Sequence, residues 1–96
     1  MSLRVTYGEF ISYMNQRRDS YSVSESGKLI TITFSGSSPM VVEKLGKPVT
    51  VTITAEREDA DVIFKAMRVV VGEDSYDASP SSLESWLIEV TGRLPQ

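Results

Sequence analysis

Residues 21–34 read YSVSESGKLITITF, and this stretch decides how the rest of the chain is interpreted. Apolar and polar side chains alternate on both sides of Ser26-Gly27, and a period of two is typical of strands that bury one face. A two-residue loop at Ser26-Gly27 predicts a hairpin in which Val23 lies opposite Ile30. We therefore expect an antiparallel sheet at the centre of the fold.

The same alternation predicts a second hairpin further along the chain. Segment 40–43 pairs with 49–54 around Leu45-Gly46, which places Met40 opposite Val51. Together the hairpins make a four-stranded, mostly antiparallel sheet with one apolar and one threonine-rich face. The apolar face carries Ile30, Ile32, Phe34, Val49, Val51 and Ile53, and the other face carries Thr31, Thr33, Thr50 and Thr52.

Three helices complete the prediction. The first covers about residues 7–18 and begins at the capping box Thr6–Glu9. The second covers about residues 55–71, where apolar side chains recur at helical spacing before Gly72. The third begins after Ser79-Pro80 and ends at Gly92. The expected stripe of the second helix is Ala60, Ile63, Phe64, Met67 and Val71.

These elements predict a single α+β domain over residues 1–96. Its order is α-β-β-β-β-α-α, and three amphipathic helices with one apolar sheet face indicate a two-layer arrangement. A chain of 96 residues has the length of one domain.

Composition excludes several classes of function. The chain has no Cys and no His, which excludes thiolate nucleophiles, zinc–thiolate sites and Ser-His-Asp triads. Neither an N-terminal signal peptide nor an apolar stretch of membrane-spanning length is recognisable. We therefore expect a soluble, cytoplasmic protein without cofactor, catalytic or metal residues, and without a membrane partner.

Charge is distributed unevenly along the chain. Residues 1–55 carry six cations and four anions, whereas residues 56–96 carry four cations and nine anions. The cations of the first part are candidates for a small basic patch that contacts nucleic acid: Arg4, Arg17, Arg18, Lys28, Lys44 and Lys47. Glu73, Asp74 and Asp77 form a candidate acidic loop, but their spacing matches no cation-binding motif.

Three hypotheses on function follow. The leading one is a non-enzymatic interaction or regulatory domain that binds an unknown protein partner or self-associates into a homodimer, because a small sheet leaves two edges open. The alternative is a small nucleic-acid-binding accessory protein that uses the basic residues. A third hypothesis is an enzyme built on carboxylates, which requires a cleft around acidic side chains of perturbed pKa.

Overall fold

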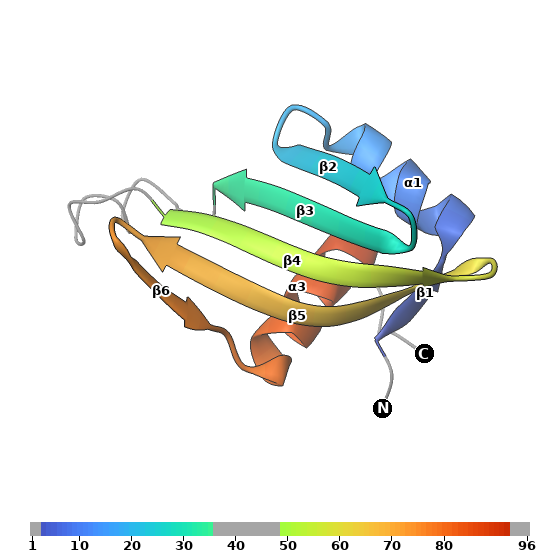
Figure 1. Cartoon of the computed structure of the whole chain (residues 1–96). Coiled ribbons are helices and arrows are strands. Elements are labelled where there is room, and N and C mark those ends of the chain that lie inside the picture. Colours follow the sequence, from blue (N-terminus) through green and yellow to red (C-terminus); the bar gives the residue numbers. More distant parts are fainter. Residues whose placement is uncertain (1–2, 36–48, 93–96) are drawn as a thin grey trace.

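The sheet predicted around residues 21–34 is the centre of the structure, and it is larger than expected. A computed structural model describes residues 3–35 and 49–92. Within these residues, six strands form one antiparallel sheet, and two helices lie behind it (Figure 1). The elements are β1 (Arg4–Thr6), α1 (Tyr7–Gln16), β2 (Tyr21–Ser26), β3 (Leu29–Ser35), β4 (Val49–Glu58), β5 (Asp61–Val71), β6 (Asp74–Asp77) and α3 (Pro80–Thr91).

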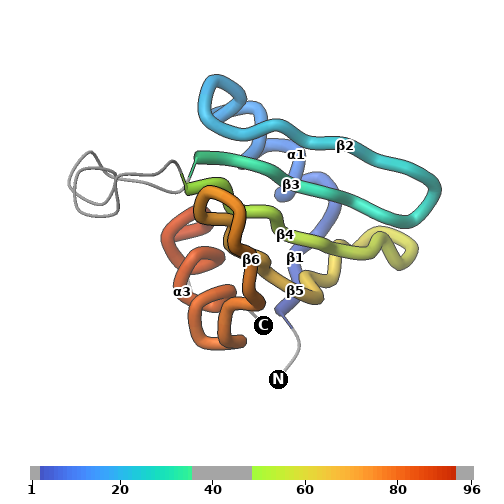
Figure 2. The backbone as a smooth tube through the Cα atoms, turned by 60° about the vertical axis from the view of Figure 1, so that its left-hand side comes forward, coloured from blue at the N-terminus to red at the C-terminus, as the bar shows by residue number. Residues whose placement is uncertain are grey.

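The strands lie in the order β1-β5-β4-β3-β2, so β2 forms one edge of the sheet. The other edge is shared, because β1 pairs with residues 61–63 of β5 and β6 pairs with residues 68–71 of the same strand. The tube in Figure 2 shows β2 beside β3 at one side of the sheet, with α3 close to β5 and β6. One edge is therefore a single strand and the other is made of two short ones.

The predicted fold class is wrong in its strand and helix numbers. The structure has six strands and two helices in its described part, whereas four strands and three helices were expected. Residues 55–71, predicted as the second helix, are instead the end of β4, a turn and β5. The turn passes through Asp59, whose φ of 54° is left-handed and better tolerated by Asp than by most residues.

A β-bulge explains why β5 resembles a helix in sequence. Thr54 pairs with Ala66 but Ala55 pairs with Phe64, so Lys65 is an extra residue in β5. The bulge moves the inward-facing positions from 62 and 64 to 67, 69 and 71. The step from Phe64 to Met67 is three residues, and one such step inside an alternating strand produces the spacing of a helical stripe.

The first hairpin is present, but its predicted register is wrong by two residues. Val23 lies opposite Ile32, and Ser26 opposite Leu29, so the turn residues are Gly27 and Lys28. Gly27 has a φ of 61°, and a glycine with positive φ at the first position of a two-residue turn is the type II′ arrangement. A shift of two residues leaves every side chain on its predicted face.

The second predicted hairpin does not form as expected. Its first arm, 40–43, and its turn at Leu45-Gly46 lie outside the described residues. Its second arm belongs to β4, where Val51 pairs with Phe34 on one side and Val69 on the other. Both sides of Val51 are occupied, so it is not available to Met40.

The two helices begin and end largely where their sequence signals predict. Thr6 accepts the amide of Glu9 at 3.2 Å at the start of α1, and Ser79 accepts the amide of Ser82 at 3.2 Å at the start of α3. Gly92 ends α3 in the left-handed conformation, with a φ of 74°. These caps satisfy amides and carbonyls that helix ends leave unpaired.

Both helices pack on the same face of the sheet. Trp86 of α3 lies at the junction, with its ring centroid 5.7 Å from that of Phe64 in β5 and 6.1 Å from that of Phe34 in β3. Phe64 also contacts Phe10 of α1, at 6.1 Å between centroids. The predicted apolar face is confirmed, since its members at positions 30, 32 and 53 are fully buried. The threonine face lies on the side away from the helices.

Candidate functional site

The outer side of β2 is the candidate functional site. β2 pairs with β3 alone, and among the described elements none lies along its other side (Figures 1 and 2). Its six residues read YSVSES, and all except the half-buried Tyr21 are exposed. An exposed strand edge is a template on which another extended chain can pair.

The turn determines which backbone groups of β2 point outward. Ser26 and Leu29 close a two-residue turn, so they form a hydrogen-bonded pair. Hydrogen-bonded pairs alternate along an antiparallel ladder, which directs the N–H and C=O groups of Tyr21, Val23 and Glu25 away from β3. The amide of Tyr21 already donates to the carbonyl of Arg17 at 3.0 Å. The outward groups are therefore two amides and three carbonyls.

The side chains of β2 leave this edge unguarded. Sheet edges are commonly blocked by Lys or Pro, by a bulge, or by a very short strand. β2 contains no Lys and no Pro, and its pairing with β3 runs without a register shift. Val23 is 38% exposed although it pairs with the fully buried Ile32 and lies on the helix side of the sheet. The edge thus combines unpaired backbone with one exposed apolar side chain.

The only charged side chain of β2 is held by contacts to the helix side. The Tyr7 hydroxyl donates to the Glu25 carboxylate at 2.9 Å, and the Arg57 guanidinium lies 3.7 Å from the centre of the Tyr7 ring. The hydrogen bond to Glu25 raises the pKa of Tyr7, with partial burial and the Glu25 charge adding to the effect and Arg57 opposing it. These contacts favour a Glu25 side chain that stays over the helix side rather than across the outward backbone.

The opposite edge of the sheet is covered piecewise. Arg4 of β1 is 3.3 Å from Asp61 and 4.0 Å from Glu58, and Arg68 of β5 is 3.4 Å from Asp77 of β6. The exposed ion pairs each contribute little to stability. They do place charges along both short strands, which is one of the devices that discourage pairing with another chain.

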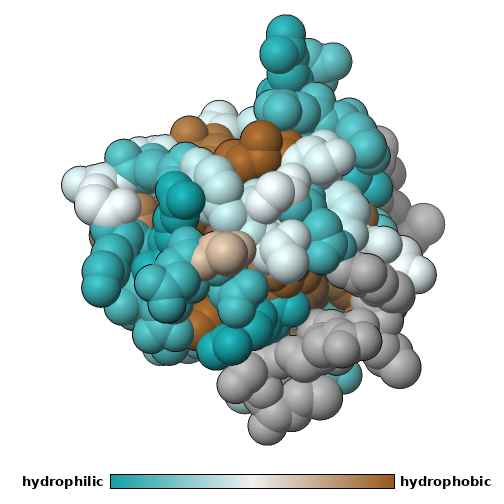
Figure 3. Space-filling view, turned by 90° about the vertical axis from the view of Figure 1, so that its right-hand side faces the viewer, coloured by the Kyte–Doolittle hydropathy of each residue, from teal (hydrophilic) through white to brown (hydrophobic). Residues whose placement is uncertain are grey.

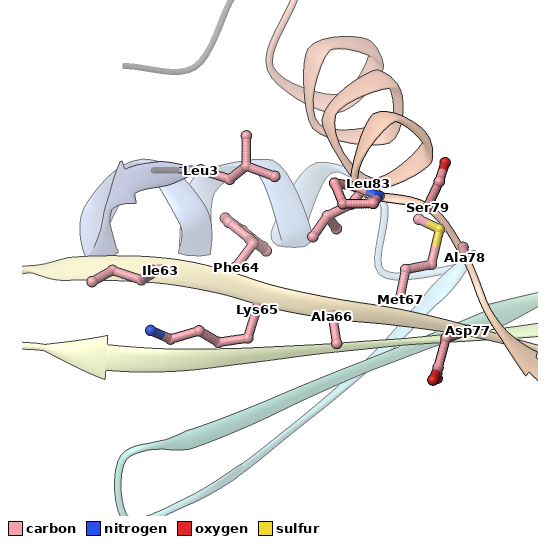
Figure 4. Close-up of a pocket in the computed structure, with 11 residues that line it drawn as sticks. Leu3, Ile63, Phe64, Lys65, Ala66, Met67, Asp77, Ala78, Ser79 and Leu83 are labelled. Atoms are coloured by element: carbon pink, nitrogen blue, oxygen red, sulfur yellow. The ribbon is translucent and has the colours of Figure 1, made fainter. Parts of the chain in front are cut away.

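A groove of about 480 Å³ lies between the two short strands. Leu3, Phe64 and Leu83 line it on the helix side of β5, whereas Lys65 and Asp77 project to the other side (Figure 4). The Phe64 amide donates to the Leu3 carbonyl at 2.8 Å, and the Ala78 amide donates to the Met67 carbonyl at 2.8 Å. These two bonds satisfy the backbone of β5 at both ends of the groove. The part of the β5 edge left open between β1 and β6 is therefore too short to pair with more than a few residues of another chain.

The described basic candidates do not lie on one surface. Arg4 and Lys28 line one polar hollow of about 400 Å³ together with three carboxylates: Glu58, Asp59 and Asp61. This end of the molecule is largely hydrophilic, with apolar surface in small areas (Figure 3). Arg17 and Arg18 follow α1 at the other end of β2, and Lys44 and Lys47 lie outside the described residues. Nucleic-acid binding stays a prediction.

The acidic candidates do not form the expected interhelical loop. Glu73 lies in the turn after β5, and Asp74 and Asp77 begin and end β6. All three are exposed, and Asp77 forms an ion pair with Arg68. Within residues 3–35 and 49–92 no group of three or more acidic side chains could hold a metal ion. Carboxylate catalysis also stays a prediction.

Sequence reasoning pointed to sheet edges in general but to no residue of β2. The signal was present, because YSVSES alternates regularly and lacks the residues that protect an edge. The contact between Tyr7 and Glu25 had no sequence signal, since the two residues lie eighteen positions apart on different elements.

The chain matches no protein-family model, no curated protein and no solved structure. Neither helix in the described part of the chain has the length and apolar character needed to cross a membrane.

Proposed function

We propose that the protein is a non-catalytic interaction domain that binds an extended segment of a protein chain along β2. The observation that carries this proposal is the bare edge of β2, with unpaired outward amides and carbonyls, an exposed Val23 and no protective residue. Binding of this kind adds a strand to an existing sheet.

The edge offers a bound strand both backbone and side-chain contacts. Main-chain hydrogen bonds to Val23 and Glu25 provide affinity for any extended segment, and each contributes about 1 kcal/mol net. Side chains of a bound strand alternate between the two faces of the sheet. On the helix side they meet Val23, which favours an apolar residue, and on the other side they meet Ser22 and Ser24. The preferred ligand is therefore a strand of alternating apolar and small polar residues.

A selection from a library of short unconstrained peptides, displayed against the immobilised full chain, tests this proposal. Val23→Pro removes the central outward amide without touching the ladder to β3, whereas the matched control Val23→Thr keeps that amide and a branched side chain. Peptides selected on the natural chain should lose about fivefold or more in affinity for Val23→Pro. They should bind Val23→Thr within about threefold of the natural chain.

Two results would overturn the proposal. One is a set of selected peptides that bind Val23→Pro as tightly as the natural chain, because their site then lies away from the outward backbone of β2. The other is a chain that stays monomeric at all concentrations and yields no specific binder in the selection. Circular dichroism of each variant confirms that the sheet is retained before affinities are compared.

A further inference from the structure

We propose that the strand which pairs with β2 is β2 of a second copy of this chain, antiparallel and centred on Val23. This inference rests on the proposed function and names its partner. A twofold axis perpendicular to the sheet relates the copies and joins the two sheets into one, with the helices of both copies on the same side. The closed symmetry limits the assembly to a dimer.

The faces of β2 restrict the registers that are available. Residues directly opposite one another in an antiparallel pair lie on the same face of the sheet. Tyr21, Val23 and Glu25 lie on the helix side, so they must face odd-numbered residues of the second copy if the helices are to share one side. The outward backbone groups belong to the same three residues. Hydrogen bonding between the copies therefore also requires odd-numbered residues to face odd-numbered residues.

Like-charge repulsion and the limited length of β2 exclude all but one of the remaining registers considered. A pairing centred on Glu25 places two like charges directly opposite each other, which is unfavourable. A pairing centred on Ser22 places Asp19 opposite Glu25 of the second copy, with the same result, and runs past the start of β2 at Tyr21. A pairing centred on Ser24 places Tyr21 opposite the turn residue Gly27 instead of a strand residue. The register centred on Val23 avoids all three faults and pairs residues 21–25 with residues 25–21.

This register forms four hydrogen bonds between the copies. Each Val23 amide donates to the Val23 carbonyl of the other copy, and each Glu25 amide donates to the Tyr21 carbonyl of the other copy. The Tyr21 amide, which faces the Glu25 carbonyl of the other copy, already donates to Arg17, so this carbonyl receives no bond across the interface and the total stays at four. The two Val23 side chains, each 38% exposed in one copy, cover one another on the helix side. The contact is small, so we expect dissociation constants in the micromolar range or above, about 1–100 μM.

Single cysteines test the register, because the natural chain contains no Cys. Facing residues of a hydrogen-bonded pair have Cα atoms about 5.5 Å apart, within the range that a disulfide spans. Val23→Cys should therefore form a covalent dimer under mild oxidation. Ser24→Cys is the matched control, since Ser24 faces Ser22 of the second copy and not itself. Val23→Cys should cross-link at least about tenfold faster than Ser24→Cys, and a mixture of Ser22→Cys and Ser24→Cys should form the mixed disulfide.

Sedimentation equilibrium of the natural chain supplies the independent measurement. A dimer at high micromolar concentration, lost in Val23→Pro, together with fast cross-linking of Val23→Cys supports the inference. A monomer at all concentrations, or cross-linking of Ser24→Cys as fast as Val23→Cys, overturns it. A monomer that still selects peptides sensitive to Val23→Pro would refute the second copy as partner and leave the proposed function intact. A monomer that selects no peptide refutes both.

Discussion

The two edges of the sheet are built in opposite ways. β2 is one uninterrupted strand whose side chains alternate regularly between the two faces of the sheet. Its only charged residue, Glu25, points to the helix side. The other edge consists of β1 and β6, which are three and four residues long, with a bulge at Lys65 between them and charged residues along both. Short strands, bulges and charges all discourage pairing with another chain.

Protection of the sheet edges is selective in the described part of the chain. The side of β5 carries several protective features at once, while β2 carries only the charge of Glu25, which Tyr7 holds on the helix side. Edge protection usually costs regularity, because a bulge or a short strand gives up ladder hydrogen bonds. The regularity of β2 is therefore what makes it available as a binding surface, and it gives a physical reason to look for a partner at this edge first.

The largest expected difference between the two edges is in how much the free energy of unfolding falls when an apolar side chain at each edge is shortened. Phe64, near the β1/β6 edge, contacts both Phe10 and Trp86, so Phe64→Ala should lower the free energy of unfolding by about 3–5 kcal/mol. Val23→Ala at the β2 edge should change it by no more than about 0.5 kcal/mol. Urea denaturation at low protein concentration measures both. Equal losses in the two variants would show that Val23 belongs to the packed core and not to an open edge.

A smaller difference is expected from proline at each edge. Ala78→Pro removes the amide that donates to the Met67 carbonyl at 2.8 Å, and the free energy of unfolding should fall by about 1–3 kcal/mol. Val23→Pro removes an outward amide, and the loss should stay below about 1 kcal/mol. Thermal unfolding of the monomer compares the two. A greater loss for Val23→Pro would mean that the Val23 amide bonds within the chain, which would remove the basis of the proposed binding mode.

The parts of the fold that follow from local chemistry could be predicted from sequence. Thr6 and Ser79 begin helices because their hydroxyls accept the first amides, and Gly92 ends one because it takes a left-handed φ. The faces of β3 and β4 follow from strict alternation, which a register shift of two does not disturb. The protective residues missing from β2 are likewise visible in the sequence.

The parts that failed depend on contacts between distant residues. Lys65 bulges only because β4 lies beside β5, and without that neighbour the spacing of Phe64 and Met67 is indistinguishable from a helical one. The outer edge of β5 is divided between β1 and β6. β1 pairs with residues about sixty positions away in the sequence, whereas β6 pairs with residues that are close in the sequence. Among the described residues, the charge difference between the two parts of the sequence is partly offset in space, because Arg4 of the basic part lies against Glu58 and Asp61 of the acidic part.

The smallest expected effect is on the pH dependence of stability, and it comes from the hydrogen bond between Tyr7 and Glu25, the only charged residue of β2. The hydrogen bond to Glu25 raises the pKa of Tyr7 above its ordinary value of 10.0. Because the folded-state pKa is the higher one, the stabilisation from this contact is complete below the unfolded pKa of about 10 and is lost as pH rises through the folded-state pKa. The natural chain should therefore lose stability at pH values above about 10. Glu25→Gln should lose less over the same range, because the neutral amide no longer opposes ionisation of Tyr7.

Ultraviolet absorbance of tyrosinate measures the ionisation directly, and Tyr7→Phe identifies which titration step belongs to Tyr7. In Glu25→Gln that step should move to lower pH, while the steps of the remaining tyrosines stay in place. If the Tyr7 step is unchanged in Glu25→Gln, the carboxylate is not bound to Tyr7 in solution. Glu25 would then be able to reach across the outward backbone of β2 and protect it, and the contrast between the two edges would shrink to strand length and the bulge.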